Sequence, residues 1–337
     1  MTGIDPQLLT AAFEEAGFGG STVASVSFEP MPSEGLAADF LVANISYKTN
    51  EPDLPQSMVV KCPRLTDRGE GEANVYRNIL RDQEYLPILN CFAIVDRSEP
   101  EPLMLFFDDL RAGYHQTTWP LIPDFVNCKQ AVATLARVHA NWWGSENLPD
   151  GSTSPIARHQ EPRYLLDAFP AFVDYVGDNL SESRGRVMEK VLTQLDSLMS
   201  ERLGDANRTL LHSDPHFWNF LYPSKPGREA IVYDWALWRT GLAGWDLAYL
   251  IALHLYPAHR EAAEPLLLAH YHEALQANGV DYSLEDVEFD YRLGVLAGLM
   301  MPIMEFTWQV PPSDWIPKQE KAFAAFDALD CQALLNN

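Results

Sequence analysis

The spacing of apolar residues changes near residue 110, and this change constrains the fold more than any other feature. Before it, one segment, Glu70–Arg81, has its apolar residues on a single helical face. The other apolar segments there are short, rich in Val, Ile and Phe, and bounded by turn residues, as strands are: Thr22–Glu29, Asp39–Tyr47, Ser57–Lys61, Cys91–Asp96 and Leu103–Phe107. The first third of the chain therefore predicts five strands with one helix inserted after the third.

Beyond residue 110, apolar residues recur every three or four positions, which predicts helices: Phe125–Trp143, Gly185–Leu203, Leu242–Leu255, Ala262–Ala277 and Val287–Met304. A chain of 337 residues is long enough to bury two separate cores. We therefore expect an α+β, bilobal fold. A small N-terminal lobe with an antiparallel sheet would span residues 1–110, and a larger, mainly helical lobe would span residues 111–337.

Charge and composition exclude several classes of partner. The net charge of −23 disfavours nucleic acids and anionic membranes, which both attract a basic protein surface. No apolar run is long enough to span a bilayer, and the start of the chain lacks the pattern of a signal peptide. The four cysteines are far apart, which predicts free thiols in a reducing compartment rather than disulfides or a zinc site. We expect a cytoplasmic protein that is a monomer or a homodimer.

The run His212–Asn219 (HSDPHFWN) contains the residues that most strongly indicate a chemistry. It places an Asp and an Asn five positions apart, and Asp234 follows at the end of a short apolar run. Phosphoryl transfer from ATP needs one carboxylate to orient the attacking hydroxyl, and an amide and a second carboxylate to hold Mg²⁺. The spacing matches the pattern H-x-D-x-x-x-x-N of kinase catalytic loops. We therefore predict Asp214 as catalytic base, Asn219 and Asp234 as metal ligands, and ATP and Mg²⁺ as cofactors.

Two other interpretations stay open. Alternate side chains of an extended segment face the same way, so His212, Asp214 and His216 could bind Zn²⁺ or Fe in a metal-dependent hydrolase. That interpretation leaves Asn219 without a role, and Pro215 bends the segment. The second alternative is a relative of kinases that binds a ligand without turnover.

These motifs resemble the aminoglycoside phosphotransferase and choline kinase superfamily, and in particular its ecdysteroid-kinase-like branch. The branch is similar to this chain at Leu135–Gly144 (LARVHANWWG), Asp234-Trp235 and Trp245–Leu250 (WDLAYL), and more loosely in the terminal helix Ala322–Leu335. The resemblance implies a fold similar to that of protein kinases. It also implies that His212 heads the catalytic loop and that Asp246 braces the loop by accepting backbone N–H groups.

The resemblance places the nucleotide site in the N-terminal lobe. Lys61, at the end of a predicted strand, would pair with the phosphates of ATP, and Glu72, on the inserted helix, would anchor Lys61. The segment Leu105–Leu110 matches the connection whose backbone meets the adenine. Phe107 and Asp108 are therefore expected to contact the nucleotide.

Three positions depart from the family pattern. Gly35 is the single glycine of the segment that is expected to cover the phosphates, where many kinases have two or three. Ser213 stands where related kinases have Gly, and Ala236 stands where a Gln often follows Asp-Trp.

Tryptophans beside the catalytic segments, such as Trp218 and Trp235, favour a bulky, partly apolar hydroxyl compound as acceptor, ahead of an amino-bearing metabolite or antibiotic.

Overall fold

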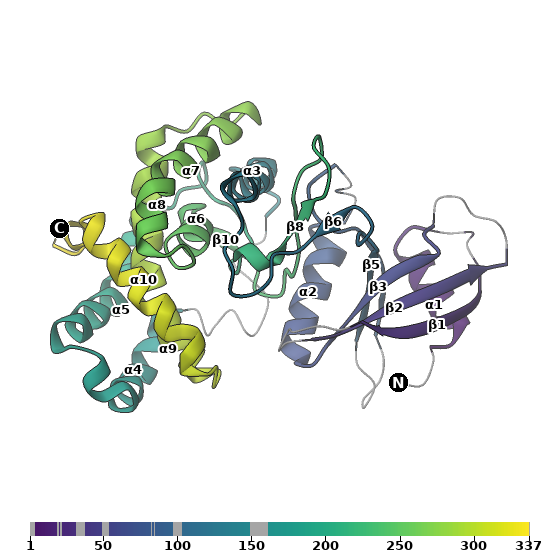
Figure 1. Ribbon diagram of the computed structural model, residues 1–337, viewed down its shortest axis with the longest axis horizontal. Coiled ribbons are helices and arrows are strands. Elements are labelled where there is room, and N and C mark those ends of the chain that lie inside the picture. Colours follow the sequence, from purple (N-terminus) through teal and green to yellow (C-terminus); the bar gives the residue numbers. More distant parts are fainter. Residues whose placement is uncertain are drawn as a thin grey trace. The chain divides into compact units, whose positions relative to one another are not determined.

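The computed structural model describes residues 4–18, 20, 22–31, 38–48, 54–81, 83, 85–96, 103–148 and 161–336 (Figure 1). The chain forms two compact units. The first, here called the N-terminal unit, is Met1–His115 with two returning segments, Pro223–Pro226 and Tyr233–Ala236. The second, the C-terminal unit, contains the rest. The return of Tyr233–Ala236 places Asp234 in the N-terminal unit, although it lies far beyond residue 110 in sequence.

A five-stranded antiparallel sheet forms the centre of the N-terminal unit, in the order β1-β2-β3-β5-β4. Its strands confirm the predicted ones: β1 Val23–Met31, β2 Ala38–Tyr47, β3 Ser57–Pro63, β4 Cys91–Val95 and β5 Met104–Asp108. A further short strand, β6 (Tyr114–His115), follows. Alternate apolar residues of the sheet, such as Met58, Val60 and Phe106, are fully buried in one core. Because β3 is hydrogen-bonded on both sides, it holds its side chains in fixed positions.

Two helices accompany this sheet. Helix α2 (Thr66–Asn78) is the predicted inserted helix, although it begins and ends earlier than Glu70–Arg81. Helix α1 (Pro6–Glu15) was not predicted. The Asp5 side chain caps it by accepting a hydrogen bond from the Gln7 N–H, and Leu9 and Phe13 bury its apolar face against β1 and β4.

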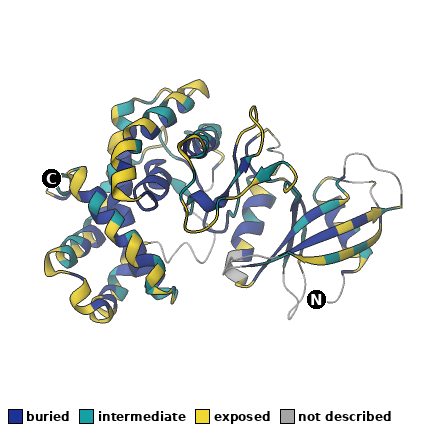
Figure 2. Ribbon diagram, viewed as in Figure 1, coloured by how far each residue is buried: buried dark blue, intermediate teal, exposed yellow. Residues whose placement is uncertain are grey.

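The C-terminal unit is mainly helical, which confirms the α+β prediction. Its α-helices in the described residues are α3 Phe125–Trp142, α4 Pro162–Val176, α5 Glu182–Arg202, α6 Gly244–Ile251, α7 Pro257–Ala277, α8 Leu284–Gly298, α9 Met301–Thr307 and α10 Pro312–Ala328. The predicted single helix Val287–Met304 is thus two helices, because the chain turns between Gly298 and Met301 and Pro302 starts a new first turn. The faces of these helices that meet one another are buried (Figure 2).

Short strands and one turn of 3₁₀-helix carry the predicted catalytic segment. They are β7 Thr209–Leu211, the turn Phe217–Asn219, β8 Phe220–Pro223, β9 Ile231–Val232 and β10 Arg239–Gly241. Strand β7 pairs with β10, and β8 pairs with β9, in both cases antiparallel. The loop that begins at His212 therefore starts from a strand that is fixed by a neighbour.

Helices α6 and α8 cross at two glycines. A Cβ on Gly244 would lie 2.1 Å from the Asp290 carbonyl oxygen, and one on Gly294 would lie 2.1 Å from the Gly244 carbonyl oxygen. No larger residue fits at either position without moving the backbone. This close contact fixes α6, which carries Asp246.

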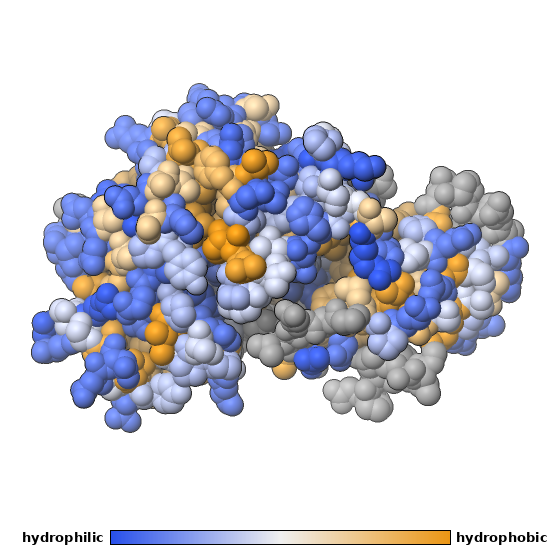
Figure 3. Space-filling view, in the orientation of Figure 1, coloured by the Kyte–Doolittle hydropathy of each residue, from blue (hydrophilic) through white to orange (hydrophobic). Residues whose placement is uncertain are grey.

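Hydrophilic residues dominate the visible surface, with small hydrophobic patches between them (Figure 3). Among the residues that the structure describes, no helix combines the length and the apolar character needed to cross a membrane.

Candidate active site

Lys61 is the centre of a buried ionic cluster in the N-terminal unit. It lies on β3, opposite Phe40 of β2 and Leu105 of β5, and its side chain is 6% exposed. The Lys61 Nζ lies 2.6 Å from Glu72 Oε2 and 2.7 Å from Asp234 Oδ1. An ammonium group buried to this extent needs such partners, because desolvation alone disfavours its charge.

Glu72 reaches Lys61 from the first half of α2, and its side chain is 2% exposed. It also accepts a hydrogen bond from the backbone N–H of Trp235, the residue after Asp234. Burial raises the pKa of Glu72, and the positive charge of Lys61 opposes this rise. Burial by itself would lower the pKa of Lys61, but the carboxylates of Asp234 and Glu72 outweigh it and raise that pKa. The cluster therefore holds Lys61 in its charged form.

Asp234 has a left-handed backbone conformation, with φ of 68°. This conformation costs a non-glycine residue roughly 1–2 kcal/mol. Strain of this kind persists where surrounding structure holds a residue in place, and it is concentrated at functional sites. Here β9 before Asp234 and the Glu72–Trp235 hydrogen bond after it fix the segment, while the Asp234 side chain stays 28% exposed.

In the C-terminal unit, Asp246 braces the start of the predicted catalytic loop. Its carboxylate is fully buried and accepts hydrogen bonds from the backbone N–H groups of His212, at 2.7 Å, and Ser213, at 2.9 Å. His139 contacts the oxygen that accepts the His212 N–H, with Nε2 at 3.2 Å from Asp246 Oδ2, and its Nδ1 lies 2.8 Å from the Tyr271 hydroxyl. His139 is thus a hydrogen-bonded core histidine that supports Asp246.

Ser213 has the same left-handed conformation as Asp234, with φ of 68°. Glycine, the residue that the resemblance implies at this position, adopts this conformation without strain. Two contacts stabilise Ser213 in its place. Its N–H donates to Asp246, and its carbonyl accepts a hydrogen bond from the indole of Trp245 at 3.5 Å.

Asp214 and Asn219 lie together in the resulting loop. The Asn219 Nδ2 donates to the Asp214 carbonyl oxygen at 2.9 Å, which turns the amide oxygen of Asn219 away from that contact. The Asp214 side chain is 21% exposed and can therefore meet a substrate, while Asn219 is buried. His216 Nε2 lies 4.0 Å from Asp214 Oδ1, beyond hydrogen-bond length.

The hydrolase alternative gains no support from this geometry. The Nδ1 atom of His212 accepts a hydrogen bond from the Asp214 N–H at 3.3 Å, so it serves the loop. Across the described ranges, no three His, Cys, Asp or Glu side chains come close enough together to hold a metal ion. A Mg²⁺ site differs in needing only one or two protein oxygens beside the phosphates.

Phe107, Asp108 and Gly35 are the other residues predicted to bind the nucleotide. Phe107 is the second-to-last residue of β5, and its buried ring lies 5.2 Å from the Tyr76 ring of α2, between centroids. The Asp108 side chain accepts a hydrogen bond from Asn90, and its N–H donates to the Asn90 carbonyl oxygen. Burial raises the pKa of Asp108, and the Asn90 hydrogen bonds oppose this rise. Their contacts with adenine stay predictions, and Gly35 lies outside the described residues.

Glu305, on α9, is a candidate site residue that sequence reasoning missed. It is 6% exposed and forms an ion pair with Lys318, and its Oε2 atom has no hydrogen-bond partner among the described residues. Burial raises the pKa of Glu305, an effect that Lys318 opposes and the nearby charge of Asp214 reinforces. No local pattern around Glu305 could have indicated this, because its proximity to Asp214 depends on the packing of the whole helical unit.

An aromatic cluster adjoins the same loop. The rings of Trp119 and Trp218 meet edge to face at 4.4 Å between centroids, and Trp218 lies 5.6 Å from both His216 and His254. Trp119 is 48% exposed. The loop of Asp214 is thus bordered by flat aromatic faces.

Solved structures of small-molecule kinases share this architecture. Choline kinase from Cryptosporidium parvum Iowa II has a TM-score of 0.60 and 13% identity, and the comparison covers 99% of this chain and 100% of that chain. Aminoglycoside phosphotransferase APH(4)-Ia has a TM-score of 0.54 and 16% identity, covering 94% and 97%. Choline kinase LicA from Streptococcus pneumoniae has a TM-score of 0.53 and 13% identity, covering 91% and 94%. The fold is therefore protein-kinase-like, as the motifs predicted.

Sequence comparison identifies the family. No curated protein matches the chain closely enough to count as a relative. The model of the Ecdysteroid kinase-like family matches residues 71–281, which include the predicted catalytic loop, Asp234 and Asp246. This confirms the resemblance seen in the motifs, and the chain belongs to the ecdysteroid kinase-like family.

Proposed function

We propose that the protein is an ATP- and Mg²⁺-dependent kinase that transfers the γ-phosphate to a hydroxyl group of a small molecule. The observation that carries this proposal is the buried cluster in which Glu72 and Asp234 both hold the Lys61 ammonium, at 2.6 and 2.7 Å. An ion pair buried this deeply contributes little net stability. A fixed ammonium group suits the stabilisation of phosphate charge.

Each predicted residue then has a distinct task. Lys61 would contact the phosphates, and Glu72 would orient it. Asp214 would orient the acceptor hydroxyl and accept its proton late in the reaction, since phosphoryl transfer has a loose transition state. The braced backbone at His212 and Ser213 keeps Asp214 in place.

The residues present fit a Mg²⁺ ion. Asp234 offers a partly exposed carboxylate, and the Asn219 amide donates through nitrogen to Asp214, which leaves its oxygen as a ligand. Hard oxygen donors of these two kinds are those that Mg²⁺ prefers. When bound, the ion would neutralise charge on the phosphates.

The acceptor would lie against the aromatic cluster and Glu305. Trp119 and Trp218 offer apolar faces, and Glu305 Oε2 offers a hydrogen-bond acceptor. Structures described as choline kinase, aminopropanol kinase and aminoglycoside phosphotransferase share the fold, which supports a small hydroxyl-bearing acceptor. A bulky, partly apolar hydroxyl compound fits these aromatic faces and this carboxylate best.

A melting experiment tests the nucleotide and metal assignment. ATP with Mg²⁺ should raise the melting temperature more than ATP alone, because a ligand that binds only the folded state stabilises it. Asp234→Ala should remove the Mg²⁺-dependent part, measured against the variant's own ligand-free melt. Asp39→Ala, which removes an exposed carboxylate paired with Arg64 on the sheet, is the matched control and should keep the full shift. An unchanged shift in Asp234→Ala would refute the assignment.

A further inference from the structure

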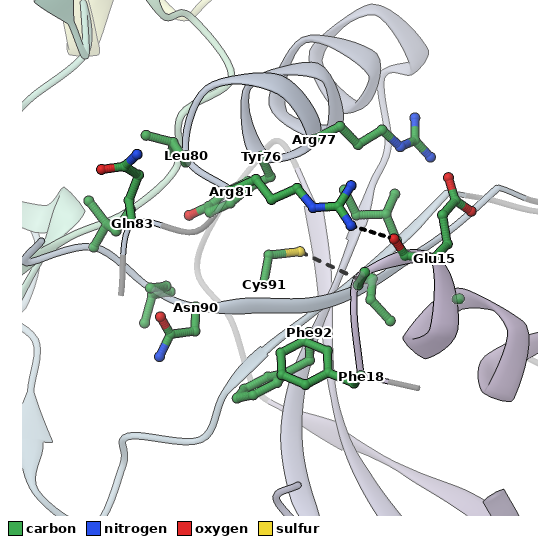
Figure 4. Close-up of a pocket in the computed structure, with 16 residues that line it drawn as sticks. Glu15, Phe18, Tyr76, Arg77, Leu80, Arg81, Gln83, Asn90, Cys91 and Phe92 are labelled. Carbon is green, nitrogen blue, oxygen red and sulfur yellow. Dashed lines mark hydrogen bonds between the residues drawn. The ribbon is translucent and has the colours of Figure 1, made fainter. Parts of the chain in front are cut away.

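A cavity of about 500 Å³ lies in the N-terminal unit, apart from all the residues proposed above for catalysis and nucleotide binding (Figure 4). It is bounded by the end of α1, the last turns of α2 and the residues that follow, and β4. Its size lies within the range of small-molecule sites, roughly 300–1,000 Å³. Nothing in the proposed reaction uses it.

The cavity has an apolar floor. The rings of Phe18 and Phe92 lie 5.3 Å apart between centroids and form its base. Ala12 and Ala16 of α1 and Ala93 of β4 also line it. These three side chains are small and fill little of the space. An unfilled apolar surface of this kind reduces packing energy, and an apolar ligand would restore it.

The rim of the cavity carries two arginines and one carboxylate, that of Glu15. Arg77 and Arg81 both line it, but their partners differ. The Arg77 Nη2 is paired with the Asp96 carboxylate at 2.5 Å, whereas the Arg81 Nη2 donates to the uncharged carbonyl oxygen of Glu15 at 2.7 Å. That hydrogen bond holds the Arg81 side chain across the rim, as Figure 4 shows. A guanidinium has five N–H donors, so an anchored Arg81 can still bind an anion.

The cavity also adjoins the helix that positions Lys61. Tyr76 lines it, lies one turn of α2 after Glu72, and packs its ring on Phe107 at 5.2 Å. A ligand in the cavity would therefore contact α1, α2 and β4 at once. It would restrict the movement of α2 relative to the sheet and so favour the arrangement in which Glu72 holds Lys61.

We infer that this cavity is a regulatory site for an amphipathic organic anion, whose apolar body packs on Phe18 and Phe92 and whose carboxylate or similar head group binds Arg81. Occupation raises the affinity of the protein for the nucleotide. This second statement rests on the proposed function, whereas binding of the anion itself does not.

Titration calorimetry with phenylbutyrate, an aryl carboxylate, tests binding on the full chain without nucleotide. Wild type should bind phenylbutyrate and should bind the uncharged phenylbutyramide at least about tenfold more weakly, the loss expected for one charge-assisted hydrogen bond. Arg81→Gln should lose about the same factor, and Arg77→Gln, whose arginine is already paired, should change the affinity by less than about twofold. No binding by wild type, or equal binding of the amide, overturns the proposal.

A second variant covers the possibility that Arg81→Gln loosens the end of α1. Ala16→Phe should fill the cavity and abolish phenylbutyrate binding without lowering the melting temperature; retained binding would contradict the placement.

The coupling between phenylbutyrate binding and nucleotide binding is measured with ADP and Mg²⁺. Phenylbutyrate should tighten ADP binding about fivefold or more, and ADP should tighten phenylbutyrate binding by the same factor. ADP binding that phenylbutyrate leaves unchanged would refute the regulatory role, and absence of ADP binding under all conditions would instead refute the proposed function.

Discussion

Glu72 holds Lys61 at 2.6 Å inside the N-terminal unit, and the same carboxylate accepts the backbone N–H that follows Asp234. One side chain of α2 thus fixes both the ammonium and the segment that carries the predicted metal ligand. Desolvating these groups is costly, and their mutual attraction offsets the cost only while all of them are present. The cluster is best understood as an arrangement for positioning charge.

Replacing Lys61 should therefore affect turnover more than binding. Lys61→Met should lower kcat by about two or more orders of magnitude, the range seen when one charge-stabilising donor is removed. Combining it with Glu72→Gln should add little further loss, because the two residues act as a unit. Kinase assays on the single and double variants measure this, and Arg64→Met, at the exposed end of the same strand segment, is the control. Losses that simply add would contradict the pairing.

Much of the fold could be predicted because its elements have strong local patterns. The five strands of the sheet and most helices of the C-terminal unit show clear two-residue or three-to-four-residue spacing. Helix α4 was not predicted, although its apolar residues Leu165, Phe169, Phe172 and Val176 follow that spacing. Pro162 starts the helix, where its missing N–H costs nothing.

The site could be predicted only in part. Asp214, Asn219 and Asp234 stand in a recognisable pattern, but the contact of Asp234 with Lys61 joins residues 173 positions apart and depends on tertiary folding. The close crossing at Gly244, which fixes Asp246, is a property of two packed helices. Glu305 likewise has no local signal.

The backbone at Ser213 gives a prediction about stability. Ser213→Gly should leave the free energy of unfolding within about 1 kcal/mol of wild type, because relief of the left-handed strain offsets the greater freedom of the unfolded chain. Ser213→Val should destabilise by about 2 kcal/mol or more, since a β-branched residue resists φ of 68°. Urea unfolding measures both. If the valine variant were as stable as the glycine variant, the strained conformation would be wrong.

Glu305 should affect the acceptor and leave the nucleotide unaffected. Glu305→Gln should raise the KM for the acceptor by about tenfold, the loss of one hydrogen bond to a charged group, while the KM for ATP stays within about twofold. Steady-state kinetics with both substrates varied provides the test. Glu320→Gln, on an exposed carboxylate of α10 that pairs with Arg184, should change neither. An equal rise in both KM values would show that Glu305 has a general structural role.

Asp109 predicts a pH dependence of stability. Its hydrogen bonds with Arg111 lower the pKa of Asp109 to about 2, from 3.8. A lowered carboxyl pKa stabilises the folded state above pH 3.8, and this contribution is lost as the pH falls from about 4 to about 2. Because the Arg111 side chain is 53% exposed, this contribution should amount to at most about 1 kcal/mol.

Urea unfolding between about pH 2 and about pH 7, which spans this window, should show a smaller acid-induced loss for Arg111→Gln than for wild type. Arg186→Gln, which breaks an exposed ion pair on α5, should follow the wild-type curve. Parallel curves for wild type and Arg111→Gln would contradict the assignment.

The most direct test of the proposed kinase is the transfer rate of Asp214→Asn. This change keeps the shape of the side chain and removes its ability to accept a proton, so ATP binding should survive while kcat falls by about two or more orders of magnitude. His216→Ala, at a side chain 4.0 Å from the Asp214 carboxylate, should keep most of the activity, whereas a metal-dependent hydrolase would lose it. Turnover by Asp214→Asn near the wild-type rate would contradict the mechanism.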